Sequence, residues 1–420
     1  MNTRRLALTF GVAFALMASG SAAALQEATP GASPAGGPPL PEGCTVVADG
    51  LVNPRYVAVA DDGTIYVSEA GTGGDELVQP PVDPAATPAP AVDAGPPGTR
   101  GTTGQVTVIA PDGTQSVLAS GLPSYSMGIE VIGPAGITIA PDGSVLLANG
   151  GAGPATAFTE ALPNENSVLS IDPASGEVTL LSDIGAFERA NNPDPFNIDS
   201  NLYGIDVGTD GTIYVNDAGG NTTYSVPAGG GEPTVLAVHP GLPIPEGVDA
   251  PPGGNPGRDG ALELDPVPTG VLSVNGSVIV GLLSGGPFPP GAAKVVSVAA
   301  DGTLSDVATG LTMVVDVTAG PDGHLYATQI STNFLGEVPE PGNVVRLLED
   351  GTQEVVVDGL MLPNGIDFDA NGNLLVVVGS VSVTGEPMGQ LLSCEGIPAT
   401  AEGSSEEVTI ALRDVFFRSW

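Results

Sequence analysis

The chain has 420 residues, and 10 Lys and Arg stand against 48 Asp and Glu, which gives a formal net charge of −38. Such a surface repels phosphate backbones and anionic lipid, so the composition argues against nucleic-acid and membrane-surface roles. Cations are its natural partners, but an acidic surface kept for solubility or salty surroundings is favoured over a dedicated cation store. Length alone suggests two or three domains, but a closed repeat of β units can run this long as one.

The N-terminus has the pattern of a secretory signal peptide at 1–24. Two arginines precede an apolar run at 6–18, and alanines at 22–24 form a cleavage pattern. Residues 25–43, rich in Pro, Ala and Gly, are predicted to be a flexible linker. No other apolar run is long enough to span a bilayer. The sequence therefore predicts an exported protein, secreted or periplasmic, with no membrane span.

One hairpin pattern recurs six times along the chain. In the first copy, 50–71, two apolar alternations flank a turn at Asp62 and Gly63. The other turns are Asp142-Gly143, Asp210-Gly211, Asn275-Gly276, Asp322-Gly323 and Asn371-Gly372. Asp-Gly supplies the positive φ that such turns need, so we do not count the turn aspartates as metal ligands. Six hairpins indicate a repeat architecture.

Two further strands joined by a tight turn follow each of the first five hairpins. Four antiparallel strands per unit, repeated around a ring, predict an all-β fold, a six-bladed β-propeller over 44–394. The sixth unit lacks its own fourth strand, and residues 45–51 match the fourth strands of other units, which also end in Gly-Leu. We therefore expect the N-terminal strand to close the ring by pairing into the last blade.

The two cysteines lie at this predicted closure. Cys44 begins the borrowed strand, and Cys394 ends 389–394, the predicted third strand of the same blade. Adjacent strands bring the two positions together, and export makes a disulfide chemically allowed, so we expect a Cys44–Cys394 disulfide, with two unpaired thiols as the alternative. Beyond it, 395–420 is predicted to be a linker followed by an orphan strand.

Long connections follow the second strands or join the blades, whereas the other turns are short. One face of the predicted disc, the loop-bearing face, therefore carries the loops, and function is expected there. The longest connection, 72–104, is so rich in Pro and Ala that we expect it to be disordered.

Two columns of polar residues are predicted to converge near the channel on the loop-bearing face. The starts of the first strands offer Arg55, Tyr203, Thr269, Asp316 and Asn364, and the ends of the second strands offer Glu69, Asn149, Asp217 and Gln329. Carboxylates and amide carbonyls suit Ca²⁺, which takes six to eight oxygen ligands in loose geometry. The sequence leaves open the alternative that these side chains solvate the channel mouth or bond to loop backbone.

Other chemistries are disfavoured. The chain has two histidines, too few for a nucleophile and base triad or a His-rich zinc site. His239 lies in a long loop and is expected to be solvated, and His324 follows a turn on the bare face. The scarcity of His, Lys and Arg also argues against a quinone-cofactor dehydrogenase.

The segment GLVNPRYVAVADDGTIYVSEAG at 50–71, with TGG at 72–74, GQVTVI at 104–109 and SGLP at 120–123, resembles the exported ScyD/ScyE family, named for proteins of cyanobacterial scytonemin gene clusters. The resemblance covers roughly 44–394. It implies an NHL-like six-bladed propeller built from NHL repeats.

A more distant resemblance is to regucalcin and gluconolactonase propellers, which hold a divalent metal with Glu, Asn and Asp in the channel. The motif LPNG at 362–365 looks like their Asn-bearing motif. The resemblance therefore implies Asn364 as a metal ligand, with Glu69, Asn149 and Asp316 as further candidates.

These patterns favour an acidic exported propeller that acts, as a monomer, as a binding or scaffold protein for a small molecule or protein at the loop-bearing face. The alternative is a divalent-metal-dependent lactonase or hydrolase. In it, Glu69 and Asn364 would hold Ca²⁺, and Asp316 or Asp217 would act as the base.

Overall fold

The protein is described by a computed structural model over residues 40–78, 98–127, 130–151, 161–196, 199–248, 260–335, 339–381 and 389–396. The predicted signal peptide, most of the linker and the orphan strand lie outside the described residues. The described part of the chain contains no helix long and apolar enough to cross a membrane.

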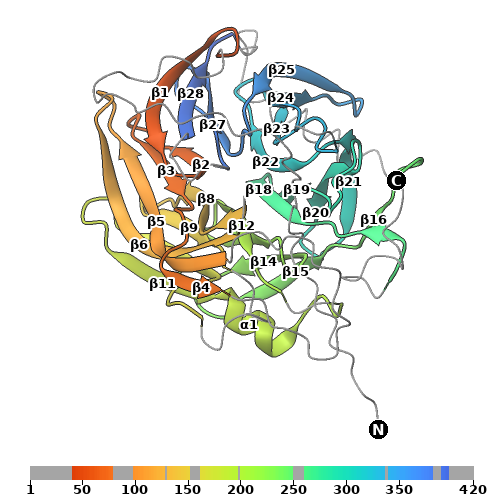
Figure 1. Ribbon diagram of the computed structural model, residues 1–420, viewed down its shortest axis with the longest axis horizontal. Coiled ribbons are helices and arrows are strands. Elements are labelled where there is room, and N and C mark those ends of the chain that lie inside the picture. The colour runs from red at the N-terminus through yellow and green to blue at the C-terminus, as the bar shows by residue number, and fades with distance from the viewer. Residues whose placement is uncertain are drawn as a thin grey trace, which may run out of the picture.

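Six first strands surround a central axis, each in contact with the next (Figure 1). They are β2 (Pro54–Val59), β8 (Pro134–Ile139), β12 (Leu202–Val207), β18 (Pro268–Val274), β22 (Val314–Ala319) and β26 (Ile366–Phe368). Each pairs outward with a second strand: β3 (Ile65–Glu69), β9 (Val145–Asn149), β13 (Ile213–Asp217), β19 (Ser277–Leu282), β23 (Leu325–Gln329) and β27 (Leu374–Val378).

Third and fourth strands complete the blades. The third strands are β5 (Gly98–Ile109), β10 (Ser167–Ile171), β14 (Thr222–Val226), β20 (Ala293–Val298), β24 (Gly342–Leu347) and β28 (Gly389–Cys394). The fourth strands are β6 (Gln115–Met127), β11 (Val178–Asp183), β15 (Thr234–Val238), β21 (Leu304–Leu311), β25 (Gln353–Leu360) and β1 (Cys44–Leu51). The predicted six-bladed β-propeller is confirmed.

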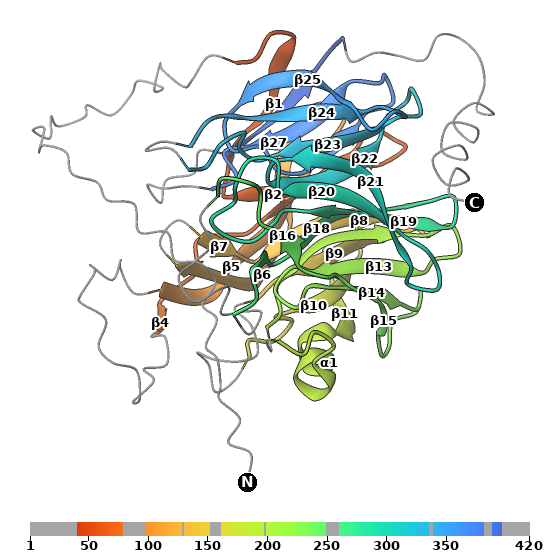
Figure 2. The same ribbon diagram turned by 90° about the vertical axis from the view of Figure 1, so that its right-hand side faces the viewer.

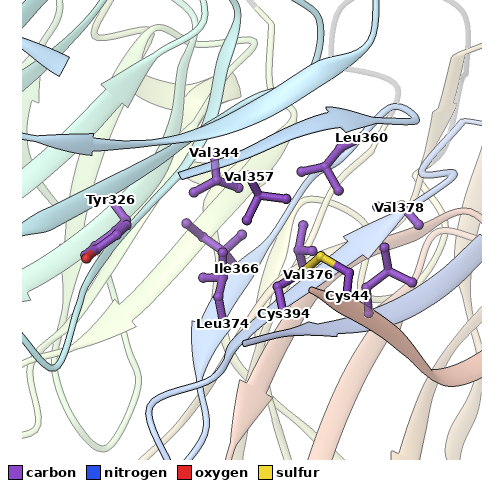
Figure 3. Close-up of a cluster of buried hydrophobic side chains, with 11 residues drawn as sticks. Cys44, Tyr326, Val344, Val357, Leu360, Ile366, Leu374, Val376, Val378 and Cys394 are labelled. Carbon is purple, nitrogen blue, oxygen red and sulfur yellow. A yellow bond between two sulfur atoms is a disulfide. The ribbon is translucent and has the colours of Figure 1, made fainter. Parts of the chain in front are cut away.

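The ring closes between the two ends of the described chain. β1 pairs antiparallel with β28 as the outermost strand of the sixth blade, so red and blue strands lie side by side in Figure 1. Cys44 and Cys394 stand opposite each other in this pair and form the predicted disulfide across a sequence separation of 350. Figure 3 shows the disulfide packed among Val376, Val378 and other apolar side chains of the last two blades.

The burial pattern explains why second and fourth strands differ in their pattern of apolar and polar residues. Second strands have neighbouring blades against both faces, so β27 is LLVVV with every residue buried. Fourth strands lie at the rim, and β25 shows exposed residues along most of its length. Packing a Val or Leu between two blades stabilises the fold by about 1.5–3 kcal/mol per side chain.

Additional elements lie in the long connections (Figure 2). They are β4 (Glu76–Val78), β7 (Glu130–Ile132), α1 (Ile184–Asn191), β16 (Leu242–Pro243) and β17 (Glu263–Leu264). β4 pairs with the first part of β5, so the predicted disorder of 72–104 is wrong for its two ends, because their backbone groups find partners in an extension of the first blade. Residues 79–97 lie outside the described part.

The turn chemistry of the hairpins is as predicted. The Asp62 carboxylate accepts the Thr64 N–H at 2.9 Å, and Gly63 has φ +85°. The same bond recurs at the other Asp-Gly hairpin turns, where Asp142, Asp210 and Asp322 accept from Ser144, Thr212 and His324. These aspartates shape the turns on the bare face.

Candidate functional site at the channel

Residues at the starts of the first strands meet across the channel. Asn364, just before β26, donates from Nδ2 to the Tyr203 hydroxyl at 2.7 Å, and Tyr203 belongs to the opposite blade. The Tyr56 ring meets the Tyr203 ring edge to face, with centroids 5.7 Å apart. The Tyr56 hydroxyl donates to the Val315 carbonyl of the fifth blade at 2.6 Å. We call Arg55, Tyr56, Tyr203 and Asn364 the channel cluster.

Arg55 adds a positive charge to the channel cluster. Its side chain is buried, and Nη2 donates to the carbonyl of Val131 in β7. Burial raises the pKa of the Glu130 carboxyl, and the Arg55 guanidinium opposes that rise. Burial also raises the pKa of the Tyr203 hydroxyl, again with Arg55 opposing, so Tyr203 is a neutral hydroxyl that accepts from Asn364 and keeps its own proton.

Asn364 has one polar atom that the fold does not satisfy. The residue is fully buried, its Nδ2 is bonded to Tyr203, and its Oδ1 has no hydrogen-bond partner. A buried carbonyl oxygen left without a donor costs about 1–3 kcal/mol. The channel cluster therefore presents a guanidinium, a hydroxyl and an unpaired acceptor from three different blades.

Asp316 lies outside this cluster and joins two blades. Its carboxylate accepts the N–H groups of Val317 and of Ile366 in the sixth blade, both at 2.8 Å. Burial raises the pKa of Asp316 well above its ordinary value, and these two amides oppose the rise. Asp206 and Asp367 form similar bonds to the next blade, to the N–H groups of Ser273 and Val59.

The pairing register explains why Asp316 was grouped with Asn364 in the sequence. Val314 pairs with Gln329 as Pro54 pairs with Glu69, so Asp316 is level with Tyr56 and not with Arg55. In the other four blades this position is Gly136, Gly204, Gly270 and Gly365. A Cβ at Gly270 would lie 2.6 Å from the Asp316 Cα, so these positions are where first strands come closest.

The side chains of the second predicted column, at the ends of the second strands, accept hydrogen bonds from loop backbone. Glu69, Asp217 and Gln329 each accept a backbone N–H at the start of their own blade. The donors are Val52, Asn201 and Thr312, at 2.6, 2.7 and 2.5 Å. Glu69 also accepts from Gln105 and Thr107, and Asp217 from Ser200 and Gly220. This matches the alternative that the sequence left open, in which the end column bonds to loop backbone.

The predicted calcium ligands are thus only partly available. Asn149 and Asn364 keep an unpaired Oδ1, whereas both carboxylate oxygens of Glu69 and of Asp316 accept hydrogen bonds from the protein. Among the described residues, no group of three or more His, Cys, Asp or Glu side chains is placed to hold a metal ion. Two free amide oxygens do not fit Ca²⁺, which takes six to eight, so we derive no catalytic step through a metal.

Two features near the channel, and one in the outer part of the third blade, were missed in the sequence or were read wrongly. Tyr56 had a readable signal, because it replaces the glycine of four other blades, but Glu130 had none. His239 was expected to be solvated and is instead buried, with Nε2 2.8 Å from the Thr223 Oγ1. Burial lowers its pKa to about 3, so it is a neutral packing residue of the third blade.

A second buried polar pair joins α1 to the third blade. The Glu188 carboxylate accepts the Tyr224 hydroxyl at 2.8 Å, and burial, with the charge of Asp217 adding, raises the pKa of Glu188 to about 8. The same two causes raise the pKa of Asp199 to about 7. α1 itself is capped by Asp183, whose side chain accepts the Ala186 N–H.

Solved structures with a similar fold include a gluconolactonase from Xanthomonas campestris. It is 14% identical in sequence, and the alignment, with a TM-score of 0.48, covers 84% of this chain and 89% of the gluconolactonase chain. Virginiamycin B lyase from Staphylococcus aureus is 15% identical, with 83% and 98% covered and a TM-score of 0.41. A protein of unknown function from Bacteroides thetaiotaomicron is 12% identical, with 84% and 76% covered and a TM-score of 0.47. A scan of protein-family models and a search of curated proteins each found no match. At these identities and TM-scores the likeness carries no argument about function.

Proposed function

We propose that this propeller is a binding protein whose channel cluster takes a small, neutral, hydroxylated molecule from the loop-bearing face. The observation that carries the proposal is the unpaired Asn364 Oδ1 beside the Tyr203 hydroxyl, with the Arg55 guanidinium in the same group. Hydroxyl groups match this set because each can donate to an amide oxygen and accept from a guanidinium. The net charge of −38 disfavours an anionic ligand.

Export is part of the same proposal. The Cys44–Cys394 disulfide supports it, because disulfides persist in oxidising compartments such as the periplasm or the cell exterior. The signal peptide predicted at 1–24 would direct the chain there.

Thermal unfolding with D-glucose, sorbitol and glucono-1,5-lactone, each at millimolar concentration, tests the proposal. A ligand of the channel cluster raises the melting temperature of the wild type in a saturable way, and Asn364→Ala removes the rise. The matched control is Asn371→Ala, in an exposed turn of the same blade. Equal responses of wild type and Asn364→Ala to all three compounds would refute the channel cluster as the site.

The lactone also tests the second candidate, a lactonase of the kind that the sequence resemblance implies. Hydrolysis releases a carboxylic acid, which titration at constant pH detects directly. Acid release that is lost in Asn364→Ala would make the protein an enzyme, whereas a melting-temperature rise without acid release supports the binding role.

A further inference from the structure

An apolar cluster lies beside the channel at the loop-bearing ends of the blades. Met313, Val315 and Ile330 are buried at its base. Five partly buried side chains pack against this base from the third to the sixth blade: Tyr203, Leu283, Phe288, Phe334 and Leu362. Tyr203 is already a member of the channel cluster, and we call the other four the apolar patch.

The apolar patch is continuous with the channel cluster through two residues. Tyr203 donates its ring to the apolar base and accepts the Asn364 Nδ2 through its hydroxyl. The pairing register places Val315, a member of that base, level with Arg55 at the start of its own first strand. The Val315 carbonyl accepts the Tyr56 hydroxyl at 2.6 Å. The apolar patch therefore begins where the channel cluster ends.

The backbone shows that the hairpin repeat does not require apolar side chains here. Asn53, Met313 and Leu362 each lie two residues after the Gly-Leu that ends a fourth strand, and their φ angles are +50°, +48° and +44°. Asparagine adopts this left-handed conformation readily, whereas Met and Leu are disfavoured in it. Phe288 lies in the same region, with φ +60°. The fifth and sixth blades thus keep apolar side chains where the first blade has the residue that the backbone favours.

The channel has a charged side and an apolar side. Arg55 and Glu130 both belong to the sheet of the first blade, which also contains β7. The apolar patch comes from the fourth, fifth and sixth blades. Covering apolar surface is favourable in proportion to its area. A ligand that uses both sides therefore combines a hydroxylated part with an apolar part.

The rings on the two sides favour an aromatic group as the apolar part. Phe288 and Phe334, in the apolar patch, meet edge to face with centroids 6.0 Å apart. Tyr56 and Tyr203, in the channel cluster, do the same at 5.7 Å. Edge-to-face contact between rings is favourable beyond the area that the rings bury. Aromatic partners are therefore present both in the patch and in the channel cluster.

We propose that the apolar patch binds an aromatic substituent on the hydroxylated molecule whose polar part lies in the channel cluster, which makes aryl glycosides the ligand class. The inference rests on the proposed function, because it assigns the second part of the same ligand. An aryl glycoside carries sugar hydroxyls that donate and accept, an apolar ring and no charge, and so matches both sides of the channel.

Isothermal titration with methyl β-D-glucoside and phenyl β-D-glucoside tests the proposal, since the two probes differ only in the substituent. We expect the wild type to bind the phenyl glucoside at least about tenfold more tightly, and Leu362→Asn to lower this preference at least about threefold. The variant should fold, because Asn53 has the same backbone conformation in the first blade. The control is Leu180→Asn, the same change at an exposed residue of β11, which should keep the preference of the wild type.

Two results would overturn the proposal. One is equal affinity of the wild type for the two glucosides, and the other is a phenyl preference that Leu362→Asn and Leu180→Asn retain alike. In either case, loss of methyl glucoside binding in Asn364→Ala would leave the proposed function standing. A wild type that sediments as a dimer, with Leu362→Asn a monomer, would also overturn the proposal and make the apolar patch an interface between two copies of the chain.

Failure of the proposed function has a different signature. A phenyl preference that Leu362→Asn lowers, with both affinities unchanged in Asn364→Ala, would keep the apolar patch as the aryl site and refute the channel cluster as the site of the sugar. Absence of binding of both glucosides to the wild type would overturn the two together.

Discussion

The Asn364 Nδ2 lies 2.7 Å from the Tyr203 hydroxyl, which joins the sixth blade to the third across the channel. Neighbouring blades are held by strand packing and by carboxylates such as Asp316, but this bond connects blades that share no interface in the ring. It also places the unpaired Asn364 Oδ1 at the channel, so one residue ties the ring together and offers an acceptor to a ligand.

A double-mutant cycle measures this bond. Asn364→Ala and Tyr203→Phe should each lower the free energy of unfolding by about 1 kcal/mol, and the double variant should lose about 1 kcal/mol less than the sum of the two. Guanidinium denaturation of the four proteins gives the coupling energy. Strict additivity would mean that the two side chains do not interact in solution.

The disulfide should contribute strongly because of the length of chain it closes. The Cys44→Ala, Cys394→Ala double variant removes a cross-link with a sequence separation of 350. In the chain-entropy model this cross-link raises the free energy of unfolding by roughly 5 kcal/mol. We expect a fall in melting temperature of about 10 °C by calorimetry. The reduced wild type is the control and should match the variant. A change of less than about 2 °C would show that pairing of β1 with β28 closes the ring by itself.

The fold was readable from the sequence because its signals are local. Alternating apolar residues and Asp-Gly turns define each hairpin, and six copies define a ring. The closure was also readable, since β1 carries the Gly-Leu ending of the other fourth strands and begins at Cys44.

The arrangement of side chains at the channel could be predicted only in part from the sequence, because it depends on strand register and on partners that are distant along the chain. A one-residue shift at the irregular start of β22 moved Asp316 from the channel to the boundary between blades. Nothing local marks Glu69 as a loop-holding residue either, because its donors include Val52 and Thr107, which lie on different strands or turns. The sequence nevertheless identified Arg55, Tyr203 and Asn364, which the structure brings together.

Stability should fall as the pH rises through neutrality. Glu188 keeps its proton in the folded protein up to about pH 8, whereas its unfolded carboxyl loses it above about pH 4.5. Its contribution is therefore complete below the unfolded pKa and is lost as the pH approaches 8, at up to about 1.4 kcal/mol per pH unit. Asp199, Asp206 and Asp367 are shifted in the same direction.

Denaturation at pH 5.5 and pH 7.5 checks this, with Glu188→Gln expected to reduce the difference by about 2–3 kcal/mol. The Gln side chain still accepts from Tyr224, so the packing is kept. The control is Asp62→Asn, because the Thr64 bonds lower the pKa of Asp62 and it does not titrate in this range. Equal pH dependence in Glu188→Gln and wild type would mean that Glu188 is ionised in the folded state.

Calcium is tested by the melting temperature in Ca²⁺ and in chelator, at moderate salt that mutes general charge repulsion. The carboxylates of Glu69 and Asp316 already accept hydrogen bonds from the protein. We therefore expect any rise in melting temperature to be equal in wild type and Asn364→Ala and to be reproduced by Mg²⁺. Such a rise would come from general neutralisation of the net charge of −38. A rise of several degrees that is specific to Ca²⁺ and absent in Asn364→Ala would instead establish the channel ion predicted from the sequence. In that case Glu69 or Asp316 must give up its present donors when the ion binds, and Glu69→Gln should weaken the Ca²⁺ response in the same experiment.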